Sequence, residues 1–539
     1  MSSTLVAPSP AAARTPEPAP AGASAPASTI GWTPCDPGFD CAQVQVPLDY
    51  DHPRGARISL ALVRLPASDP AHRIGSVFVN PGGPGGSGVD FVLGAGPSLF
   101  TPEVRARFDI VGFDPRGIAR STPLQCFDTD EDAAAVAAPV PYPTSPAETR
   151  AWITRERTVD AACARQAGPI LDHMSTANVA RDLDRLRQAA GDRLLTYYGV
   201  SYGSFLGNVY ANLFPRRFRA LVIDGVLDPV AWTTGRGGQA RRVPFSTRLR
   251  SAVGARDTLN EFFRLCDAGG SACAFGPDSA HRFATLYRTL KKHPVAFPQP
   301  DGSVLEYDES FLVGDTLGAM YDSSIWPDLA SFLAELETQA DPAALAQHLL
   351  QLRAAAAAAA APEYHNYVEG FPGVACSDTI NPTSYRAWVR AAAVSRRRDG
   401  IFGPLWTWAS SQCADWPGRD RDRYLGPFTH RTARPVLVVG NQFDPATPYQ
   451  GAVTAARLLP SSRLLTLHAW GHTSLFRSSC ADQAIGTYLL TGRTPPRGTV
   501  CEQDVVPFQQ PTASAKAAPR ASTASRPSSP RWSVSQPGR

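Results

Sequence analysis

A serine between two glycines is the first feature of this chain that can do chemistry. Residues 199–203 read Gly-Val-Ser-Tyr-Gly, after the apolar run 194–198 and before a helical pattern that continues to Pro215. A Gly-x-Ser-x-Gly pattern between a strand and a helix is typical of a nucleophile elbow, a sharp turn that exposes the serine hydroxyl. Small residues flank the serine because neighbouring backbone passes too close for a Cβ atom. The pattern alone is weak, but in this context it predicts Ser201 as a nucleophile.

A serine nucleophile needs a base, and the base needs an acid that orients it. In this architecture the chain order is serine, acid, histidine. Asp444 and His472 each follow an apolar run, so both are expected where strands end, at the same edge of a sheet as the serine. The alternatives are a turn-forming aspartate and a surface loop histidine. His468 also competes as the base, but it lies within the strand pattern, which favours a core or edge role.

The oxyanion of an acyl-transfer reaction needs two backbone N–H donors. One is expected from Tyr202, the residue after the nucleophile, and the other from the loop after the third strand. That loop reads Asn-Pro-Gly-Gly-Pro-Gly-Gly-Ser-Gly over residues 80–88. We expect Gly83 to supply the second donor; the alternative is an ordinary Gly/Pro turn. The loop lacks the Lys-Ser/Thr pair of a Walker A motif and the spacing of a dinucleotide fingerprint.

The elements around these residues predict an α/β protein. Apolar runs at 75–80 and 218–226 indicate buried strands, and residues 175–190 have the spacing and the serine start of a capped helix. Such alternation predicts a mostly parallel sheet with helices on both faces. The pattern becomes mainly helical from about 230 to 430, which predicts a lid inserted after the strand near 218–224. The predicted segments are a disordered tail at 1–30, a first core part at 31–228, the helical lid at 229–430, a second core part at 431–507 and a disordered tail at 508–539.

Ten cysteines are present, and none forms a Cys-x-x-Cys pair or lies with histidines at zinc-ligand spacing. They fall into five pairs of sequence neighbours, and five local disulfides would suit a secreted enzyme. The alternative is ten scattered, reduced core cysteines in a cytosolic protein, and spacing alone does not prove the pairing. We favour the disulfides Cys35–Cys41, Cys126–Cys163, Cys266–Cys273, Cys376–Cys413 and Cys480–Cys501.

Composition narrows the class of protein. The apolar fraction of 43% is that of a globular chain, and the net charge of +4 is spread over 52 basic and 48 acidic residues without a basic block. We therefore expect no nucleic-acid partner, and we expect a monomer. No apolar stretch of about 18 residues or more exists, so no membrane span is expected. Residues 1–29 lack the apolar region of a signal peptide, which conflicts with the export that the cysteines favour.

Five stretches, in this order, resemble the α/β-hydrolase fold: NPGGPGGSG, FDIVGFDPRG, YYGVSYGSFLG, VLVVGNQFDPATP and WGHTSL. More narrowly, they are similar to the secreted tripeptidyl aminopeptidases and prolyl iminopeptidase-like enzymes of actinomycetes. The resemblance runs from Trp32 to Val506, and residues 400–505 resemble the segment that these enzymes share around their Asp and His. Prolyl iminopeptidases usually have His-Gly-Gly-Pro-Gly where this chain has Asn80 and Pro81 before the glycines, which favours the tripeptidyl branch.

The resemblance implies a secreted serine exopeptidase that releases short peptides or a residue from free N-termini and uses no metal or cofactor. Its peptide substrate carries an ammonium group, which needs a carboxylate partner. Asp378 is the candidate, because the family often has an acidic residue beside that cysteine; the alternative is a capping or surface aspartate. Asp224 and Asp228 are further possibilities. The turn Asp114–Gly117 is expected to be structural, with Arg116 paired to a nearby carboxylate.

The sequence therefore predicts a serine hydrolase in which Ser201 attacks, His472 transfers the proton and Asp444 orients the imidazole. A carboxylic ester hydrolase is the alternative within the same fold, because the triad does not separate esters from amides. A catalytically inactive binding protein is the third hypothesis, and the intact triad and glycine loop argue against it.

Overall fold

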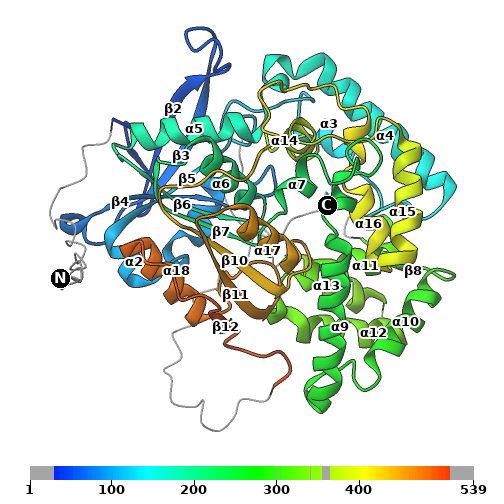
Figure 1. Cartoon of the computed structure of the whole chain (residues 1–539). Coiled ribbons are helices and arrows are strands. Elements are labelled where there is room, and N and C mark those ends of the chain that lie inside the picture. Colours follow the sequence, from blue (N-terminus) through cyan, green and yellow to red (C-terminus); the bar gives the residue numbers. More distant parts are fainter. Residues whose placement is uncertain (1–28, 300–301, 340–341, 355–363, 510–539) are drawn as a thin grey trace, which may run out of the picture.

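The computed structural model describes residues 29–299, 302–339, 342–354 and 364–509, and Figure 1 shows their arrangement. These residues form a ten-stranded sheet whose strands are not in chain order. Across the sheet, the strands are β1 (Thr33–Asp36), β2 (Phe39–Pro47), β3 (Arg57–Leu65), β5 (Phe108–Phe113), β4 (Gly75–Asn80), β6 (Leu195–Val200), β7 (Phe218–Asp224), β10 (Val436–Phe443), β11 (Ser462–Trp470) and β12 (Val500–Glu502).

The sheet is parallel from β5 to β12 and antiparallel at the end that holds β1, β2 and β3. Every residue of β4 and β6 is buried, as expected for parallel strands with helices on both faces. The predicted strand at 75–80 coincides with β4, and the run 218–226 contains β7. The expectation of a mostly parallel sheet is confirmed.

Two sets of helices cover the two faces of the sheet. One face carries α5 (Thr176–Ala189), α6 (Tyr202–Leu213) and α17 (Tyr449–Leu458), whose apolar side chains share one buried cluster. The other carries α1 (Gly88–Ala95), α2 (Pro102–Arg107) and α18 (Ser479–Thr491), which share a second cluster. Successive strand residues point to opposite faces, so Tyr197 joins the first cluster and Tyr198 the second. The predicted helix at 175–190 is α5, and Ser175 caps it.

A helical cap lies between β7 and β10 in the chain. It has its own buried core, which includes Phe262, Trp326 and Trp388, and a hairpin of β8 (Val295–Pro298) and β9 (Val304–Tyr307). In Figure 1 the cap helices gather on one side of the sheet. They are α7 (Pro229–Thr233), α8 (Phe245–Arg248), α9 (Ser251–Gly269), α10 (Ser279–Leu290), α11 (Glu309–Met320), α12 (Trp326–Thr338), α13 (Pro342–Ala354), α14 (Gly370–Asp378), α15 (Tyr385–Asp399) and α16 (Phe402–Trp408).

Two helices that precede the cap in the chain, α3 (Asp130–Ala135) and α4 (Pro146–Gln166), lie between β5 and β6 in sequence. Figure 1 shows α4 beside α15 and α16. Trp152 of α4 packs in the cap core, with its ring 6.1 Å from that of Trp408, whereas Val159 packs in the sheet core. The predicted division assigns this helix to the first core part alone. The structure differs because two faces of α4 bury apolar residues against different cores.

The predicted tails at 1–30 and 508–539 lie outside the described residues except at their inner ends. There Ile30 is buried in the sheet core, and Phe508 is buried in the cap core with its ring 5.7 Å from that of Phe262. These apolar side chains have partners that composition does not reveal. The packed part of the chain is therefore slightly longer at both ends than predicted.

All five predicted disulfides are formed. Cys126–Cys163 joins the loop after β5 to α4, and Cys376–Cys413 joins α14 to the short helix η6 (Ser411–Ala414). Cys480–Cys501 joins α18 to β12, and Cys35–Cys41 joins the neighbouring strands β1 and β2. The fifth is Cys266–Cys273. Among the described residues, no helix has the length and apolar character needed to span a bilayer.

Candidate active site

The serine lies at the turn between β6 and α6. Ser201 has φ 57° and ψ −124°, a conformation that residues with a side chain rarely adopt, and it is 7% exposed. A Cβ on Gly199 would lie 2.4 Å from the Gly203 carbonyl oxygen, and a Cβ on Gly203 would lie 2.7 Å from the Asn80 carbonyl oxygen. Both glycines are required by the close approach of backbone, as the elbow pattern predicts.

His472 and Asp444 form a buried hydrogen-bonded pair. The imidazole Nδ1 lies 2.9 Å from each carboxylate oxygen of Asp444. The carboxylate also accepts hydrogen bonds from the N–H groups of Ala446, Thr447 and Thr473, and from the Thr447 hydroxyl at 2.8 Å. Burial by itself raises the pKa of Asp444, but the charge of His472 and these hydrogen bonds lower it overall. The carboxylate is therefore ionised and can hold the imidazole.

The second ring nitrogen of His472 remains available. When Nδ1–H donates to the carboxylate, Nε2 of the neutral imidazole carries the lone pair. His472 is 6% exposed, and its Nε2 is buried without a hydrogen-bond partner in the described part of the chain. A buried polar atom left in this way is unusual and costs free energy. This arrangement suits a general base that accepts a proton from a hydroxyl group.

One short segment links the serine to the histidine. The Ser201 N–H donates to the carbonyl oxygen of Asp224, the last residue of β7, at 2.9 Å. Gly225 follows, and a Cβ there would lie 3.3 Å from Cε1 of His472 and 2.8 Å from Cγ2 of Thr473. The end of β7 thus contacts the elbow on one side and the histidine loop on the other. The structure brings the predicted nucleophile and the predicted base to one edge of the sheet.

The glycine-rich loop at 80–88 packs on the elbow. A Cβ on Gly82 would lie 2.8 Å from the backbone nitrogen of Tyr202. The Asn80 side chain accepts a hydrogen bond from the Gly82 N–H at 2.9 Å, and φ is 94° at Gly82 and 119° at Gly83. Glycine adopts such angles without steric cost. The loop is therefore held beside the Tyr202 N–H, and the role of the Gly83 N–H as second donor stays a prediction.

Asp114 supports the helix that follows this loop. Its carboxylate accepts hydrogen bonds from the Ser87 hydroxyl at 2.5 Å and the Val89 N–H at 3.1 Å, at the start of α1. Burial raises the pKa of Asp114 to about 6, against the opposing effect of these hydrogen bonds. Arg116 donates to both oxygens of Asp182 at 2.7 Å. These contacts agree with the structural role expected for the turn.

Three residues around the histidine were missed by sequence reasoning. The hydroxyl of Thr447 bonds the triad aspartate and lies 3.4 Å from Nδ1 of His472. The ring of Tyr321, from the cap, packs edge-on at 5.1 Å from the imidazole. The Asn441 side chain donates to the carbonyl just before the histidine at 2.7 Å. Only Thr447, three residues after the aspartate, had a local position that could have drawn attention to it.

The predicted ammonium anchor, Asp378, does not fit that role. It is 2% exposed, and it accepts hydrogen bonds from the Thr176 N–H at 2.8 Å, the Thr176 hydroxyl at 2.5 Å and the Trp232 indole at 3.4 Å. Burial raises its pKa to about 7 although these hydrogen bonds lower it. The Thr176 hydroxyl in turn contacts the Tyr202 hydroxyl. Asp378 therefore braces the residue after the nucleophile, through a threonine 202 positions away that no local pattern could reveal.

The other sequence candidates are also engaged within the protein. Asp224 accepts hydrogen bonds from the N–H and hydroxyl of Ser474, so it holds the segment just after the histidine. Asp228 caps α7 and pairs with Arg236 at 2.7 Å. His468 lies 2.6 Å from a glutamate of β12, which agrees with the expected edge role. None of these side chains competes with the triad or is free to receive an ammonium group.

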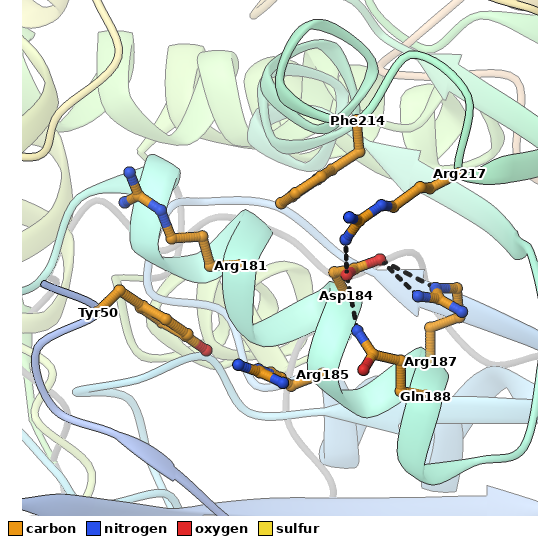
Figure 2. Close-up of a pocket in the computed structure, with 8 residues that line it drawn as sticks. All are labelled: Tyr50, Arg181, Asp184, Arg185, Arg187, Gln188, Phe214 and Arg217. Carbon is orange, nitrogen blue, oxygen red and sulfur yellow. Dashed lines mark hydrogen bonds and ion pairs between the residues drawn. The ribbon is translucent and has the colours of Figure 1, made fainter. Parts of the chain in front are cut away.

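A hollow of about 590 Å³ lies along α5 (Figure 2), and its lining residues do not include Ser201, Asp444 or His472. Four arginines line it, and Asp184 lies among them. Asp184 pairs with Arg187 at 2.9 Å and with Arg217 at 2.7 Å, Arg181 lies 3.7 Å from Asp422, and Arg185 adds a further positive charge. Like charges repel, so this basic hollow does not suit the ammonium group of a peptide N-terminus.

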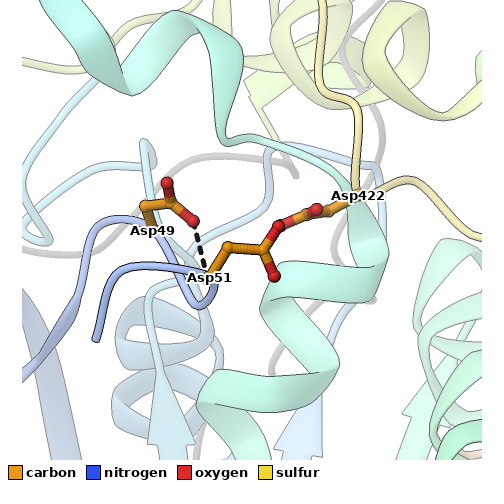
Figure 3. A group of neighbouring side chains, drawn as sticks. All are labelled: Asp49, Asp51 and Asp422. Atoms are coloured by element: carbon orange, nitrogen blue, oxygen red, sulfur yellow. Dashed lines mark hydrogen bonds between the residues drawn. The ribbon is translucent and has the colours of Figure 1, made fainter.

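Three carboxylates, those of Asp49, Asp51 and Asp422, come together at the surface (Figure 3). One oxygen of each lies within 4.8 Å of the others. His52 lies 2.7 Å from Asp49, and Arg181 lies 3.7 Å from Asp422. Neighbouring side chains thus already balance part of the negative charge, and such a cluster does not by itself define a metal centre.

Known proteins match this chain over most of its length. A family model described as "TAP-like protein" matches residues 399–501, and one described as "alpha/beta hydrolase fold" matches residues 75–311. The chain is 34% identical over 513 residues to serine protease Hip1 of Mycobacterium tuberculosis, which covers 88% of this chain and 91% of that protein. It is 33% identical over 496 residues to tripeptidyl aminopeptidase of Streptomyces lividans, and this match covers 89% of this chain and 87% of that protein. Carboxylesterase B of Mycobacterium tuberculosis is 33% identical over 470 residues, which covers 86% of each chain.

Proposed function

The chain belongs to the α/β-hydrolase family of these serine peptidases and is a serine hydrolase, and on this premise we propose that it releases tripeptides from free N-termini. The similarity to a tripeptidyl aminopeptidase spans almost nine-tenths of both chains and supports this substrate class. The TAP-like match at 399–501 includes Asp444 and His472, so the resemblance covers the acid and the base.

In the proposed reaction, Ser201 attacks the scissile carbonyl carbon while Nε2 of His472 accepts the hydroxyl proton. The imidazolium then gives that proton to the leaving amine, and the C–N bond breaks to leave an acyl-enzyme. Water attacks the ester with the same base, which releases the tripeptide and returns the proton to Ser201. Asp444 holds the imidazole in one tautomer and stabilises its positive charge.

The backbone N–H groups of Tyr202 and Gly83 are the proposed donors to the oxyanion. Tyr202 is the first residue of α6, where the helix dipole favours negative charge. The contact between Gly82 and the Tyr202 nitrogen keeps the glycine loop next to this donor. Loss of one such donor typically lowers kcat by about 10²- to 10³-fold.

The observation that carries the proposal is the state of His472. Its Nδ1 is bonded to both oxygens of a buried carboxylate, and its Nε2 is buried without a partner among the described residues. The Nδ1 bond favours the tautomer in which Nε2 is an acceptor, which is the state that a base for Ser201 needs. In the described residues no hydrogen bond joins this Nε2 to the Ser201 hydroxyl, so the proton transfer between them is part of the proposal.

The covering of the site by the cap favours a substrate that binds by the end of its chain. Ser201, Asp444 and His472 are each 7% exposed or less, and Tyr321 of the cap packs on the imidazole. An N-terminal segment can enter a covered site as a single flexible strand, whereas an internal bond needs room for the chain on both sides. A covered site also excludes water from the reacting atoms.

A carboxylic ester hydrolase is the second candidate function. The similarity to Carboxylesterase B is 33% over 86% of this chain, as high as the similarity to the peptidase from Streptomyces. Because Ser201, His472 and Asp444 would act in the same way on an ester, the substrate decides between the two.

We further propose that the protein works outside the cytoplasm, as a monomer that acts on peptides. Five disulfides among the described residues are typical of an oxidising compartment. Extraction of the protein with and without a thiol-blocking reagent would report whether the ten cysteines are oxidised in the producing cell.

The proposal is tested with a chromogenic tripeptide amide such as Ala-Pro-Ala, with a free and with an acetylated N-terminus, next to a short acyl ester. Cleavage of the free peptide but not of the acetylated one, lost in Ser201→Ala, is the expected result. Ester turnover with neither peptide cleaved would establish the esterase instead. No turnover of any substrate by the folded protein would contradict both functions.

A further inference from the structure

The cap reaches the histidine through its backbone as well as through a side chain. Tyr321 and Asp322 directly follow α11, and the carbonyl oxygen of Tyr321 accepts a hydrogen bond from the His472 N–H at 2.9 Å. Asp322 pairs with Gly471 in an isolated antiparallel bridge. The Tyr321 ring also packs edge-on against the imidazole, at 71° between ring planes. A corner of the cap thus runs directly alongside the histidine.

Arg477 ties this corner to the histidine loop. Its Nε donates to the carbonyl oxygen of Thr473 at 3.1 Å, and its Nη2 donates to the carbonyl oxygens of Tyr321 at 2.6 Å and His472 at 3.4 Å. Its Nη1 lies 3.4 Å from the carboxylate of Asp322. The planar guanidinium group carries five N–H donors in a rigid fork, so one side chain can join several acceptors at defined angles.

The guanidinium group is buried where the loop backbone is strained. Arg477 is 5% exposed, and a buried cation is tolerated only with polar partners. A Cβ on Gly471 would lie 2.6 Å from Cζ of Arg477, so the cation occupies the space next to this glycine. Thr473 has φ 66° and Phe476 has φ 60°, conformations that persist only when surrounding contacts hold them. Arg477 supplies such a contact, because it donates to the carbonyls of His472 and Thr473 within the loop and to Tyr321 of the cap.

We propose that Arg477 is a positioning residue that couples the cap to the imidazole of His472; this inference rests on the proposed function. It donates to the carbonyl of the histidine, to the carbonyl of Thr473 after it, and to the cap carbonyl that receives the histidine N–H. The cap corner is in this view a part of the catalytic machinery and not only a cover. A displacement of about 1 Å in a reacting group can lower the rate about 100-fold, so a loosened imidazole is expected to affect the chemical step.

Arg248 offers a matched control in the cap. It is 7% exposed, and its guanidinium group also binds backbone carbonyls: Nε donates to Ala231 at 2.8 Å, and Nη2 donates to Trp232 at 2.9 Å and Thr233 at 3.0 Å. It has no contact with the histidine loop in the described residues. Loss of either arginine removes a buried cation and leaves carbonyls without donors; Arg248 also donates to the carbonyls of Ala240, Val243 and Ile380, so its loss is expected to cost at least as much stability as the loss of Arg477. Only Arg477 is expected to affect the base.

The experiment compares Arg477→Met, Arg477→Lys and Arg248→Met, each normalised to folded protein by its thermal transition. For Arg477→Met we expect kcat to fall about 30- to 100-fold with KM changed less than about 3-fold, because a displaced base affects the transition state more than substrate binding. Arg477→Lys is expected to recover part of this loss, and millimolar guanidinium ion is expected to raise the kcat of Arg477→Met but not of Arg248→Met. Arg248→Met is expected to keep kcat within about 3-fold at an equal or larger loss of Tm.

The inference is overturned if Arg477→Met keeps the wild-type kcat while it is folded, or if kcat and Tm fall equally in both methionine variants without guanidinium rescue. Ser201→Ala in the same series separates this outcome from failure of the proposed function. If Ser201→Ala is inactive and Arg477→Met is fully active, only the positioning role of Arg477 is ruled out. If Ser201→Ala is active, the proposed function itself is ruled out.

Discussion

The serine turn and the histidine loop both contain a residue with a side chain and a positive φ, but different contacts hold them. At the elbow, the close contacts of Gly199 and Gly203 are with residues of the turn itself and with Asn80 at the end of a neighbouring strand. The histidine loop is held by two side chains from distant parts of the chain, Asp224 from β7 and Asn441 from β10, and by Arg477, which follows the histidine by five positions and binds the distant cap.

This difference separates two ways of building a catalytic residue. The backbone geometry of Ser201, the proposed nucleophile, depends mainly on small residues within five positions, so a short motif predicts it. The base depends on contacts that form only after the sheet and the cap have packed. Changes that disturb the cap are therefore expected to affect His472 more than Ser201.

The largest expected effect is that of Ser201→Ala. Loss of the hydroxyl is expected to lower kcat/KM by about 10⁴-fold or more, because no acyl-enzyme can form without the attacking oxygen. Initial rates with the free tripeptide amide measure this loss, and an unchanged Tm shows that the fold is intact. A variant that retains a tenth of the wild-type rate would exclude Ser201 as the nucleophile.

The second prediction compares the serine turn and the histidine loop by the effect of one added methyl group in each. In Gly203→Ala the Cβ would meet backbone at 2.7 Å, which is expected to destabilise the fold by about 2–3 kcal/mol. In Gly471→Ala the Cβ would meet Cζ of Arg477 at 2.6 Å and the backbone carbonyl oxygen of Tyr321 at 2.7 Å, at a φ of 119°. We expect Gly471→Ala to lose at least as much stability, and to lower kcat about 100-fold in addition, because both atoms belong to the contacts that hold the histidine loop.

Denaturant unfolding and kcat are measured for both variants, with Gly94→Ala as a control because no atom lies within 4 Å of a Cβ there. The comparison between the regions fails if Gly471→Ala is as active as Gly94→Ala, or if Gly203→Ala costs no stability.

The third prediction concerns Thr447, whose hydroxyl donates to the triad carboxylate at 2.8 Å. Thr447→Val keeps the shape but removes the donor, so the carboxylate holds the imidazole less firmly. We expect kcat/KM to fall about 10-fold, in the range seen when a group that orients an active-site residue is lost. Thr447→Ser keeps the hydroxyl and is expected to restore most of the rate. Equal rates for the valine and serine variants would show that the hydroxyl does not contribute.

The smallest effect is expected for Asp378→Asn, which should change stability and not substrate binding. Burial raises the pKa of Asp378 to about 7 in the folded protein, above the value of about 3.9 in an unfolded chain. The folded state therefore binds the extra proton between these values, and the stability that it contributes is lost as the pH rises through about 7. The asparagine does not titrate, so the wild type should lose Tm relative to the variant between pH 5 and pH 8.

Thermal unfolding of both proteins at pH 5, 6.5 and 8 measures this difference. A gap in Tm that is constant with pH, or that changes in favour of the wild type at high pH, would contradict the assignment. KM for the free tripeptide is expected to stay within about 3-fold of wild type, since a lost ammonium anchor would cost more than a single exposed charge pair.

Local patterns were enough to predict several strands and helices of the sheet region and the candidate triad, but not the β8–β9 hairpin of the cap. The strand at 75–80 and the helix α5 follow from apolar periodicity and a serine cap, which depend on neighbours within one or two turns of the chain. Ser201 follows from two glycines, and Asp444 and His472 follow from their places after apolar strands. The five disulfides join cysteines that are near in sequence, so proximity along the chain was a good guide.

The tertiary structure alone decided which polar groups serve the site. Asp378 had the right charge for a substrate anchor, but Thr176, 202 positions away, occupies its carboxylate. Arg477 had no motif, and its bond to Tyr321 spans 156 positions. A hydrogen bond between distant residues leaves no periodicity in either segment, because each segment only has to supply one donor or acceptor. The sequence by itself therefore determined where the nucleophile turns out of the sheet, and packing of the cap decided what holds its base.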